Sequence, residues 1–195
     1  MSDIQKVLID KVTNLNPIWI MRQAGRYLPE FREIRSKNTD FIKLCLNKEL
    51  ASEITLQPLK RFELDAAIIF SDILMLPHGL NQKVEFKKNV GPLLGDLNLD
   101  DISSLEEKNF TDKINPVYEA INIVSNDKLT NNKSTIGFVG APWTLLVYMI
   151  NKQSPKLKLI DNFFENVELI KKILSTLEKF LKIHIKNQID NGAQV

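Results

Sequence analysis

The sequence predicts a parallel α/β fold, in which short buried strands alternate with helices. Three apolar runs, at residues 17–23, 66–70 and 135–140, have the continuous hydrophobicity of strands that are covered on both faces. Segments with helical spacing of apolar residues follow these runs. The alternation is typical of a parallel sheet, built either as a doubly wound sheet or as a (β/α)8 barrel. Both architectures place their working residues beyond the carboxyl ends of the strands.

The start of the chain is expected to contain a lead-in, a strand and a loop. Residues 1–16 are polar with a short apolar periodicity. Residues 17–23 form an apolar run that ends in a charge, which indicates a buried strand. Gly25 and Pro29 break regular structure, so a loop is expected to begin at Arg26.

A helix and a second strand are predicted next. Residues 40–62 have helical spacing, and Pro58 is expected to kink or divide the helix. The candidate inward positions are Phe41, Leu44, Cys45, Ile54 and Leu59. The run at residues 66–70 is bounded by Asp65 and Asp72 and predicts a parallel strand.

The middle of the chain is less regular. Residues 79–101 are rich in turn residues and are interpreted as an excursion from the main fold. Residues 115–125 predict a helix that holds Pro116 in its first turn. The third apolar run, at residues 135–140, ends at the Ala-Pro-Trp sequence of residues 141–143.

The clearest helix is predicted at residues 162–190, and Asn191-Gly192 is a fitting C-cap for it. His184 lies beside its apolar stripe and is interpreted as structural or at the solvent edge. Residues 193–195 look like the opening of a fourth strand. The stripe consists of Phe163, Val167, Ile170, Leu174, Leu177, Leu181 and Ile185.

Composition limits the class of function. The net charge of +2 over 195 residues gives no support for binding to nucleic acid or to a membrane surface. The single cysteine, Cys45, excludes an internal disulfide and fits a reducing, cytoplasmic compartment. The N-terminus has no signal-peptide pattern, and no apolar run approaches the roughly 18 residues that a membrane span needs. No metal-ligand spacing and no nucleotide-binding motif is visible.

The strongest functional signal is a cluster of arginines. Four of the five arginines lie within fourteen residues, whereas the chain otherwise uses 21 lysines. A guanidinium grips a carboxylate or phosphate with two hydrogen bonds, so the cluster predicts an anion-binding site. The alternative is a solvated basic face that is paired through Glu30 and Glu33. The clustered arginines are Arg22, Arg26, Arg32 and Arg35.

Polar candidates follow each of the three predicted strands. Arg22 and Arg26 come after the first strand, Asp72 comes after the second, and residues 143–148 come after the third. Because the carboxyl ends of parallel strands meet at one edge of a sheet, we expect these residues to form a single site.

The sequence Met-Arg-Gln-Ala-Gly-Arg-Tyr-Leu-Pro-Glu at residues 21–30 strongly resembles the uroporphyrinogen decarboxylase family of haem biosynthesis. The resemblance continues through Phe-Ser-Asp-Ile-Leu at residues 70–74 and Gly-Phe-Val-Gly-Ala-Pro-Trp-Thr at residues 137–144, with Tyr148 a few residues further on. The segments arrive in the family's order, and nearly all of residues 15–195 can be followed.

The resemblance implies a (β/α)8 barrel that works as a homodimer, without a metal or organic cofactor. It implies removal of the four acetate carboxyls of uroporphyrinogen III as carbon dioxide, which gives coproporphyrinogen III. Residues 1–195 would form one domain that holds about the first half of the barrel and ends as the fourth strand begins. We therefore expect a fragment of the family's longer proteins. Two alternatives stay open: a non-catalytic tetrapyrrole-binding fragment, and a zinc-dependent, corrinoid-linked methyltransferase of the same superfamily, which should lack the two-arginine motif.

The resemblance also assigns site residues. Arg22 and Arg26 match the family's substrate-binding arginines, and Arg35 matches another arginine at the cleft. Asp72 matches its central aspartate, and Tyr148 matches its cleft tyrosine. The intervening backbone is formed by Gln23, Ala24 and Gly25, where glycine lets the main chain approach a ligand closely.

The chemistry of decarboxylation gives Asp72 a role. Loss of carbon dioxide leaves electrons on a methylene carbon, and a pyrrole ring protonated on carbon can accept them. A carboxylate that faces the pyrrole N–H groups would stabilise this cation and orient the macrocycle. The proton donor stays open between a substrate carboxyl and a water held by Arg22 or Arg26, because an arginine is a poor general acid. The structural alternatives are an N-cap for Asp72 and core packing for Tyr148.

Overall fold

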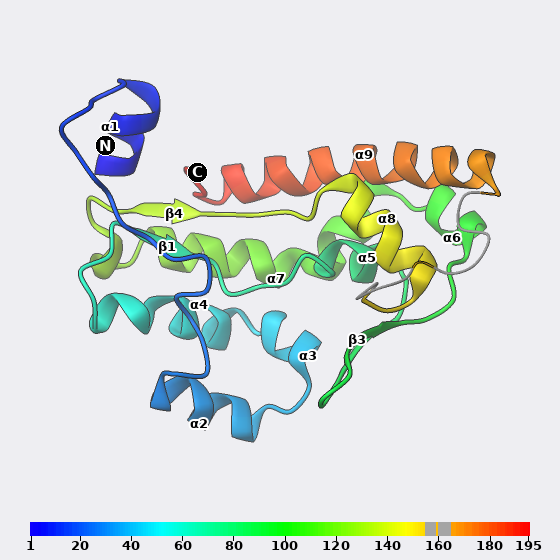
Figure 1. Cartoon of the computed structure of the whole chain (residues 1–195), viewed down its shortest axis with the longest axis horizontal. Coiled ribbons are helices and arrows are strands. Elements are labelled where there is room, and N and C mark those ends of the chain that lie inside the picture. The colour runs from blue at the N-terminus through cyan, green and yellow to red at the C-terminus, as the bar shows by residue number, and fades with distance from the viewer. Residues whose placement is uncertain (155–158, 160–164) are drawn as a thin grey trace.

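The computed structural model describes residues 1–154, 159 and 165–195, which form a mixed α/β structure that is mostly helical around a small parallel sheet (Figure 1). The α-helices are α1 (Asp3–Ile9), α2 (Pro29–Lys37), α3 (Phe41–Cys45), α4 (Lys48–Leu56), α5 (Met75–Gly79), α6 (Leu99–Ser103), α7 (Glu107–Ser125), α8 (Pro142–Asn151) and α9 (Val167–Asp190). The strands are β1 (Ala66–Ile68), β2 (Val84–Lys87), β3 (Gly91–Leu94) and β4 (Ser134–Ile136), and the 3-10 helices are η1 (Pro58–Lys60) and η2 (Lys128–Thr130). The predicted α/β class is confirmed at this level.

The parallel sheet joins two segments that are far apart in the sequence. β1 pairs with β4, with Ala66 opposite Ser134 and Ile68 opposite Ile136. The second and third apolar runs are therefore confirmed as parallel strands, although each strand is shorter than its run. The other edge of β4 is bonded to the C-terminal residues, because Gly137 N donates to Val195 O at 2.9 Å.

The predicted first strand, residues 17–23, is wrong. This segment has no regular strand, and the side chains of residues 18–21 are exposed, Met21 by 73%. It nevertheless runs beside β1, because Asp65 N donates to Ile18 O at 2.9 Å and Ile18 N donates to Asp65 Oδ2 at 2.6 Å. A continuous apolar run predicts a strand only if other elements cover it, and no described element covers this one.

Helices cover the two faces of the sheet unequally. Helix α7 packs between α4 and α9, and these three helices run as a layer along the sheet (Figure 1). Ala67 and Ile69 pack against α7 residues, including Ala120. Successive strand residues point to opposite faces. Ala66 accordingly packs on the other face, against Ile4 of α1.

Two helix predictions need correction at their boundaries. Helix α7 begins at Glu107, so Pro116 lies inside the helix and not in its first turn. Burial of the inward residues Phe110 and Ile114 stabilises the turns before the proline and overrides the lost backbone hydrogen bond. The helix predicted at residues 40–62 is divided into α3, α4 and η1, and Pro58 begins η1, as expected for a proline that divides a helix.

The excursion at residues 79–101 is more regular than expected. It contains the antiparallel hairpin of β2 and β3, with Val84 opposite Leu94. Gly91 has a φ of +102°, and Asn89 has a φ of +63°, so the hairpin turn uses residue types that tolerate left-handed backbone.

Helix α9 is confirmed, but its buried stripe differs from the prediction. The predicted start at residues 162–164, including Phe163, lies outside the described residues. Val167 and Ile185 are 52% and 41% exposed, because the buried face turns instead toward α7 and α8. The buried stripe consists of Ile170, Ile173, Leu177, Phe180, Leu181, His184 and Gln188.

His184 is structural, in agreement with one of its two interpretations. Its Nδ1 lies 2.9 Å from the hydroxyl of Tyr118 on α7, and burial lowers the pKa of the imidazole to about 4. The predicted C-cap of α9 is also confirmed, since Asn191 caps the helix and Gly192 has a φ of +109°. Within the described part of the chain, the helices are too short or too polar to cross a membrane.

Candidate functional site

The carboxyl ends of β1 and β4 bring two loops together. A Cβ atom placed on Gly140, after β4, would lie 3.1 Å from Cβ of Ile73, after β1. Ile73 directly follows Asp72 in the sequence. The parallel register thus places the Asp72 loop beside the segment that leads into α8.

Asp72 is held by its own loop. Its Oδ1 accepts a hydrogen bond from Leu74 N at 2.9 Å, which forms an Asx-turn before α5. The N-cap position of α5 is Leu74, so Asp72 caps the turn that precedes the helix and not the helix itself. Burial raises the pKa of the Asp72 carboxyl, and the Leu74 N–H and the Arg22 guanidinium oppose this rise.

Three of the predicted site residues lie in one electrostatic environment. Arg22 lowers the pKa of Asp72, so its charge lies close enough to favour the carboxylate. Burial raises the pKa of the nearby Cys45 thiol, Asp72 raises it further, and Arg35 lowers it. The buried thiol therefore senses both Asp72 and Arg35. Arg22 therefore acts on the charge of Asp72, and Asp72 and Arg35 both act on the Cys45 thiol.

An aromatic ring supports Arg35. The Arg35 guanidinium carbon lies 5.7 Å from the centroid of the Phe41 ring, a cation–π distance. Phe41 in turn packs edge-on against Phe70 at 5.7 Å and tilted against Phe86 at 4.5 Å. Arg35 Nη1 also donates to the carbonyl of Asn38. Helical spacing predicts Phe41 only as an inward position, because its contact with Arg35 depends on the angle between α2 and α3.

Gln23 anchors the arginine loop. Its side chain is only 1% exposed, and its Nε2 donates to Ala66 O of β1 at 2.8 Å. Its Oε1 accepts from Ile20 N at 3.3 Å. Ala24 packs against the core cluster that contains Leu28. These contacts use both side chains to fasten the loop to the fold. The backbone of Gln23 is engaged as well, because its N–H donates to Ile20 O at 3.0 Å and its carbonyl accepts from the Tyr27 hydroxyl. The predicted contact of Gln23 and Ala24 with a substrate stays a prediction.

Gly25 is not required by the fold. Its φ is not in the left-handed region, and a Cβ atom on it would lie 3.7 Å from the Tyr27 ring, an ordinary contact distance. The glycine therefore relieves no strain and no clash within the described structure. A ligand that approaches the loop backbone would explain why this position has no side chain.

Local acidic residues do not neutralise the clustered arginines. Glu30 pairs with the distant Arg61, at 2.7 and 3.0 Å, and Glu33 pairs with Lys37 at 2.7 Å. Within residues 1–154, 159 and 165–195, neither Arg22 nor Arg26 forms an ion pair, and both side chains are exposed. The interpretation as a paired basic face is therefore wrong for these two arginines.

Arg32 has a structural role within the cluster. Its Nη1 donates to the carbonyls of Arg26 at 2.8 Å and Tyr27 at 3.2 Å. Arg32 therefore braces the loop that carries Arg26 and does not pair with its neighbour Glu33, as the basic-face interpretation required.

Tyr148 is not placed with the other site residues by its contacts. The half-buried side chain packs against the main hydrophobic core, and its hydroxyl lies 3.5 Å from Ser154 Oγ. Its predicted role at the cleft stays a prediction.

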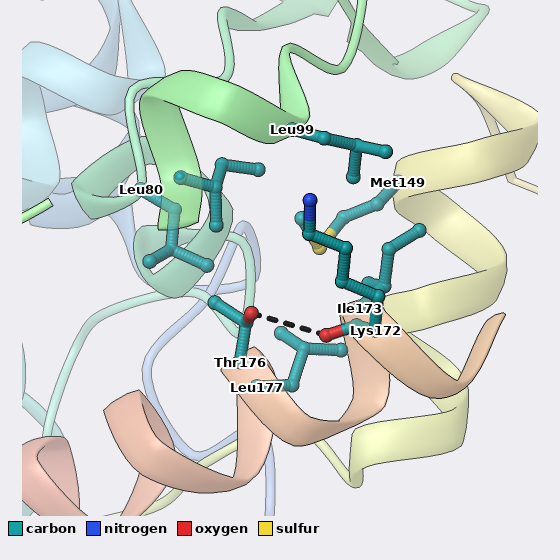
Figure 2. Close-up of a pocket in the computed structure, with 8 residues that line it drawn as sticks. Leu80, Leu99, Met149, Lys172, Ile173, Thr176 and Leu177 are labelled. Atoms are coloured by element: carbon teal, nitrogen blue, oxygen red, sulfur yellow. Dashed lines mark hydrogen bonds between the residues drawn. The ribbon is translucent and has the colours of Figure 1, made fainter. Parts of the chain in front are cut away.

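A small pocket lies outside the candidate site (Figure 2). It is formed by Leu80, α6, α8 and α9, and its free volume of about 10 Å³ can hold at most one water molecule. None of the predicted site residues lines it. No group of three histidine, cysteine, aspartate or glutamate side chains in the described ranges is placed to hold a metal ion.

Comparisons with known proteins match the whole chain. The profile of the family "Uroporphyrinogen decarboxylase (URO-D)" matches residues 1–195. The chain is 43% identical over 187 residues to a uroporphyrinogen decarboxylase of Campylobacter jejuni, covering 94% of this chain and 55% of the relative. It is 42% identical over 189 residues to the uroporphyrinogen decarboxylase of Rickettsia bellii, covering 96% of this chain and 55% of that relative. The chain thus spans about half the length of these curated relatives.

A solved structure has a similar fold. A methyltransferase from Methanosarcina mazei superposes with a TM-score of 0.72, covering 97% of this chain and 55% of its own. The sequence identity is 16%, so this likeness concerns the fold alone.

Proposed function

The chain belongs to the uroporphyrinogen decarboxylase family, and we propose that it supplies the arginine-rich part of an active site that decarboxylates uroporphyrinogen III. The reaction removes the four acetate carboxyls as carbon dioxide and gives coproporphyrinogen III. The observation that carries the proposal is the half-buried Asp72 carboxyl, which lies within the electrostatic reach of Arg22 and of the buried Cys45 thiol, on which Arg35 also acts.

The arginines suit a substrate with many carboxylates. Arg22 and Arg26 are exposed on a loop that is fastened to β1, so their guanidinium groups are free to bind carboxylates bidentately. Arg35 is held over Phe41 and presents a third positive charge. Ala24 and Gly25 lie between the first two arginines and are half-buried, so their backbone is the part of the loop that a macrocycle would approach, while the buried Gln23 anchors it.

Asp72 would act on the developing positive charge. An ionised carboxylate accepts hydrogen bonds from pyrrole N–H groups and stabilises the ring when it is protonated on carbon. Such preorganised stabilisation is worth about 3–4 kcal/mol for a single group. The Asx-turn bond to Leu74 engages Oδ1 and leaves Oδ2 for the substrate. The proton itself would come from a substrate carboxyl or from a water held by Arg22 or Arg26.

The proposal extends to architecture and assembly. Residues 1–195 would form one domain that corresponds to about half of a (β/α)8 barrel, with β1 and β4 as neighbouring barrel strands and α4, α7 and α9 in the outer layer. The bonds of residues 193–195 to β4 support a further strand at that edge. The protein would work as a cytoplasmic homodimer, as the resemblance to the family implies, and Tyr148 would line the cleft.

A decisive test uses a chimaera, because the chain spans about half of its relatives. Residues 1–195 replace the matching part of the Campylobacter jejuni relative, and the purified protein is incubated with uroporphyrinogen III. Chromatography measures the loss of carboxyl groups from the substrate. The proposal is supported if the chimaera removes them and the same chimaera with Asp72→Asn does not. Tight binding of coproporphyrinogen without turnover would instead favour the non-catalytic tetrapyrrole-binding alternative. The chain alone is assayed in parallel, to measure what these 195 residues do by themselves.

A further inference from the structure

The pairing of β1 with β4 stops abruptly. Its last hydrogen bond runs from Ile69 N to Ile136 O at 3.0 Å. In a regular parallel ladder, the next bonds would join Phe138 N to Ile69 O and Ser71 N to Phe138 O. Phe138 makes neither bond in the described structure, because both of its backbone groups are bonded to a side chain instead.

That side chain belongs to Gln188 on α9. Phe138 N donates to Gln188 Oε1 at 3.0 Å, and Gln188 Nε2 donates to Phe138 O at 3.1 Å. A primary amide carries a donor and an acceptor in one plane, so it can bond both the N–H and the C=O of one extended residue, as a neighbouring strand does. Gln188 is only 3% exposed, so little water competes for these bonds. Gln188 thus takes the place of β1 as the partner of β4.

The surroundings of Gln188 fit this contact closely. A Cβ atom at position 137 would overlap Gln188 Oε1, so Gly137 is the residue that admits the side chain. The backbone of Gln188 is also fixed, because its carbonyl accepts from Ala193 N at 3.0 Å. We call the two hydrogen bonds between the Gln188 amide and the Phe138 backbone the clamp. Its base is fixed on α9, and Gly137 leaves the space that the Gln188 side chain fills.

The clamp lies between the end of β4 and the loops of the candidate site. Phe138 comes two residues before Gly140, which meets Ile73 beside Asp72. If β4 continued to pair with β1, Phe138 O would accept from Ser71 N, and the backbone of the two loops would stay in ladder register. We propose that Gln188 is a positioning residue whose amide ends the β1–β4 pairing and sets the separation of the loops that carry Asp72 and Gly140.

A buried side chain also holds the opposite edge of β1. Ile69 faces β4 in the ladder, so Phe70 faces the other edge, where its N–H donates to Thr55 Oγ1 of α4 at 2.8 Å. Thr55 Oγ1 donates its own proton to Ala51 O at 2.7 Å, so it acts as an acceptor toward Phe70. A buried polar side chain of an outer helix therefore holds the backbone just beyond each strand, but only the Gln188 bonds replace β1–β4 ladder bonds.

The test uses the 195-residue chain and needs no turnover. The inference rests on the proposed function only in treating Asp72 as a working group, so a failed decarboxylase assay leaves this result readable. Gln188→Met keeps the length of the side chain and removes both bonds. We expect amide exchange at Phe138 to become about tenfold faster, as for loss of one buried hydrogen bond, while amides within α7 keep their rates. The Asp72 carboxyl, followed by carbon NMR, should titrate at a different pH.

Asn187→Ala is the matched control. Asn187 is the neighbouring amide on α9, and its Nδ2 donates only within the helix, to Ile183 O at 3.0 Å. This variant should leave exchange at Phe138 and the Asp72 titration as they are in the parent.

Gln188→Glu provides an independent test. A protonated carboxyl reproduces both the donor and the acceptor, whereas a carboxylate can only accept. Phe138 protection should therefore be close to the parent value at low pH and fall as the new carboxyl ionises, with the parent measured at the same pH values. If Gln188→Met does not fold, this series decides by itself.

Three results would overturn the inference. They are unchanged Phe138 protection in Gln188→Met, an equal rise in exchange throughout the core, and an unchanged Asp72 titration. Rapid exchange of the Gln188 Nε2 protons in the unsubstituted chain would overturn it as well.

Discussion

The arginine loop and the carboxyl end of the sheet contribute to the same candidate site by opposite means. The loop is exposed, and Gln23 holds it through one buried side chain, so that Arg22 and Arg26 face solvent. The sheet end is half-buried, and its backbone is held by buried side chains of outer helices, with Asp72 fixed by an Asx-turn. Under the proposed function, Arg22 and Arg26 of the loop would bind the carboxylates of the substrate. The sheet end would hold the Asp72 carboxylate that acts on the ring.

The largest effect is expected for Asp72, at the carboxyl end of the sheet. In the chimaera, Asp72→Asn should lower turnover about 10²–10³-fold, the usual effect of removing one preorganised stabilising group. Substrate affinity should change much less, because the arginines supply most of the binding. Steady-state kinetics with uroporphyrinogen III separates the two effects. Equal turnover in variant and parent would remove Asp72 from the mechanism.

The next effect concerns the support of the sheet end. Thr55→Val removes the acceptor for Phe70 N–H without changing the side-chain shape, so it should lower the free energy of unfolding by about 1–3 kcal/mol. Thr55→Ser keeps the hydroxyl and should lose less. Ser52→Ala is the matched control, because Ser52 Oγ donates only to Glu49 O of its own helix, at 2.9 Å. Urea unfolding measures all three, and similar losses in Thr55→Val and Ser52→Ala would contradict a special role for the Phe70 bond.

A smaller effect is expected in the exposed half. Arg26→Lys keeps the charge but loses the planar fork, so substrate affinity in the chimaera should fall about tenfold, which is the scale of one charge-assisted hydrogen bond. Thermal stability should stay unchanged, because the Arg26 side chain is exposed. Arg32→Lys serves as the comparison, since Arg32 binds loop carbonyls and should affect stability more than affinity. Unchanged substrate affinity in Arg26→Lys would favour the alternative that Arg26 belongs to a solvated basic face and does not bind substrate.

The smallest effect is a dependence of stability on pH. Asp72 has an ordinary pKa of 3.8, and burial raises the pKa in the folded chain. The neutral carboxyl therefore favours folding below pH 3.8, and this contribution is lost as the pH rises through the folded pKa. Asp72→Asn should accordingly melt at a higher temperature than the parent at neutral pH, and this advantage should vanish at acid pH. A lower melting temperature of the variant at neutral pH would show that Arg22 and Leu74 outweigh burial.

Local sequence signals predicted the elements that depend on local interactions. The apolar runs at β1 and β4, the long α9 helix, the break at Pro58 and the Asn191-Gly192 cap were all visible in residue spacing or backbone preference. The same signals failed for residues 17–23, which have the apolarity of a strand but lack covering elements in the described structure. An apolar run shows that a segment has side chains suited to burial. It does not show whether another helix or strand packs over those side chains.

The residue order alone was enough to recognise the family, through Arg22 and Arg26 and through the aspartate that follows a buried strand. Which side chains of the candidate site stay free for a ligand depends on the fold. The Gln23 side chain is hydrogen-bonded to β1, and the Arg35 guanidinium lies over the Phe41 ring. Gln188 is hydrogen-bonded to Phe138, which is fifty residues earlier in the sequence. The physical reason is that hydrogen-bond and ring contacts require a distance and an angle, and both are set by helix packing and strand register, not by spacing along the chain.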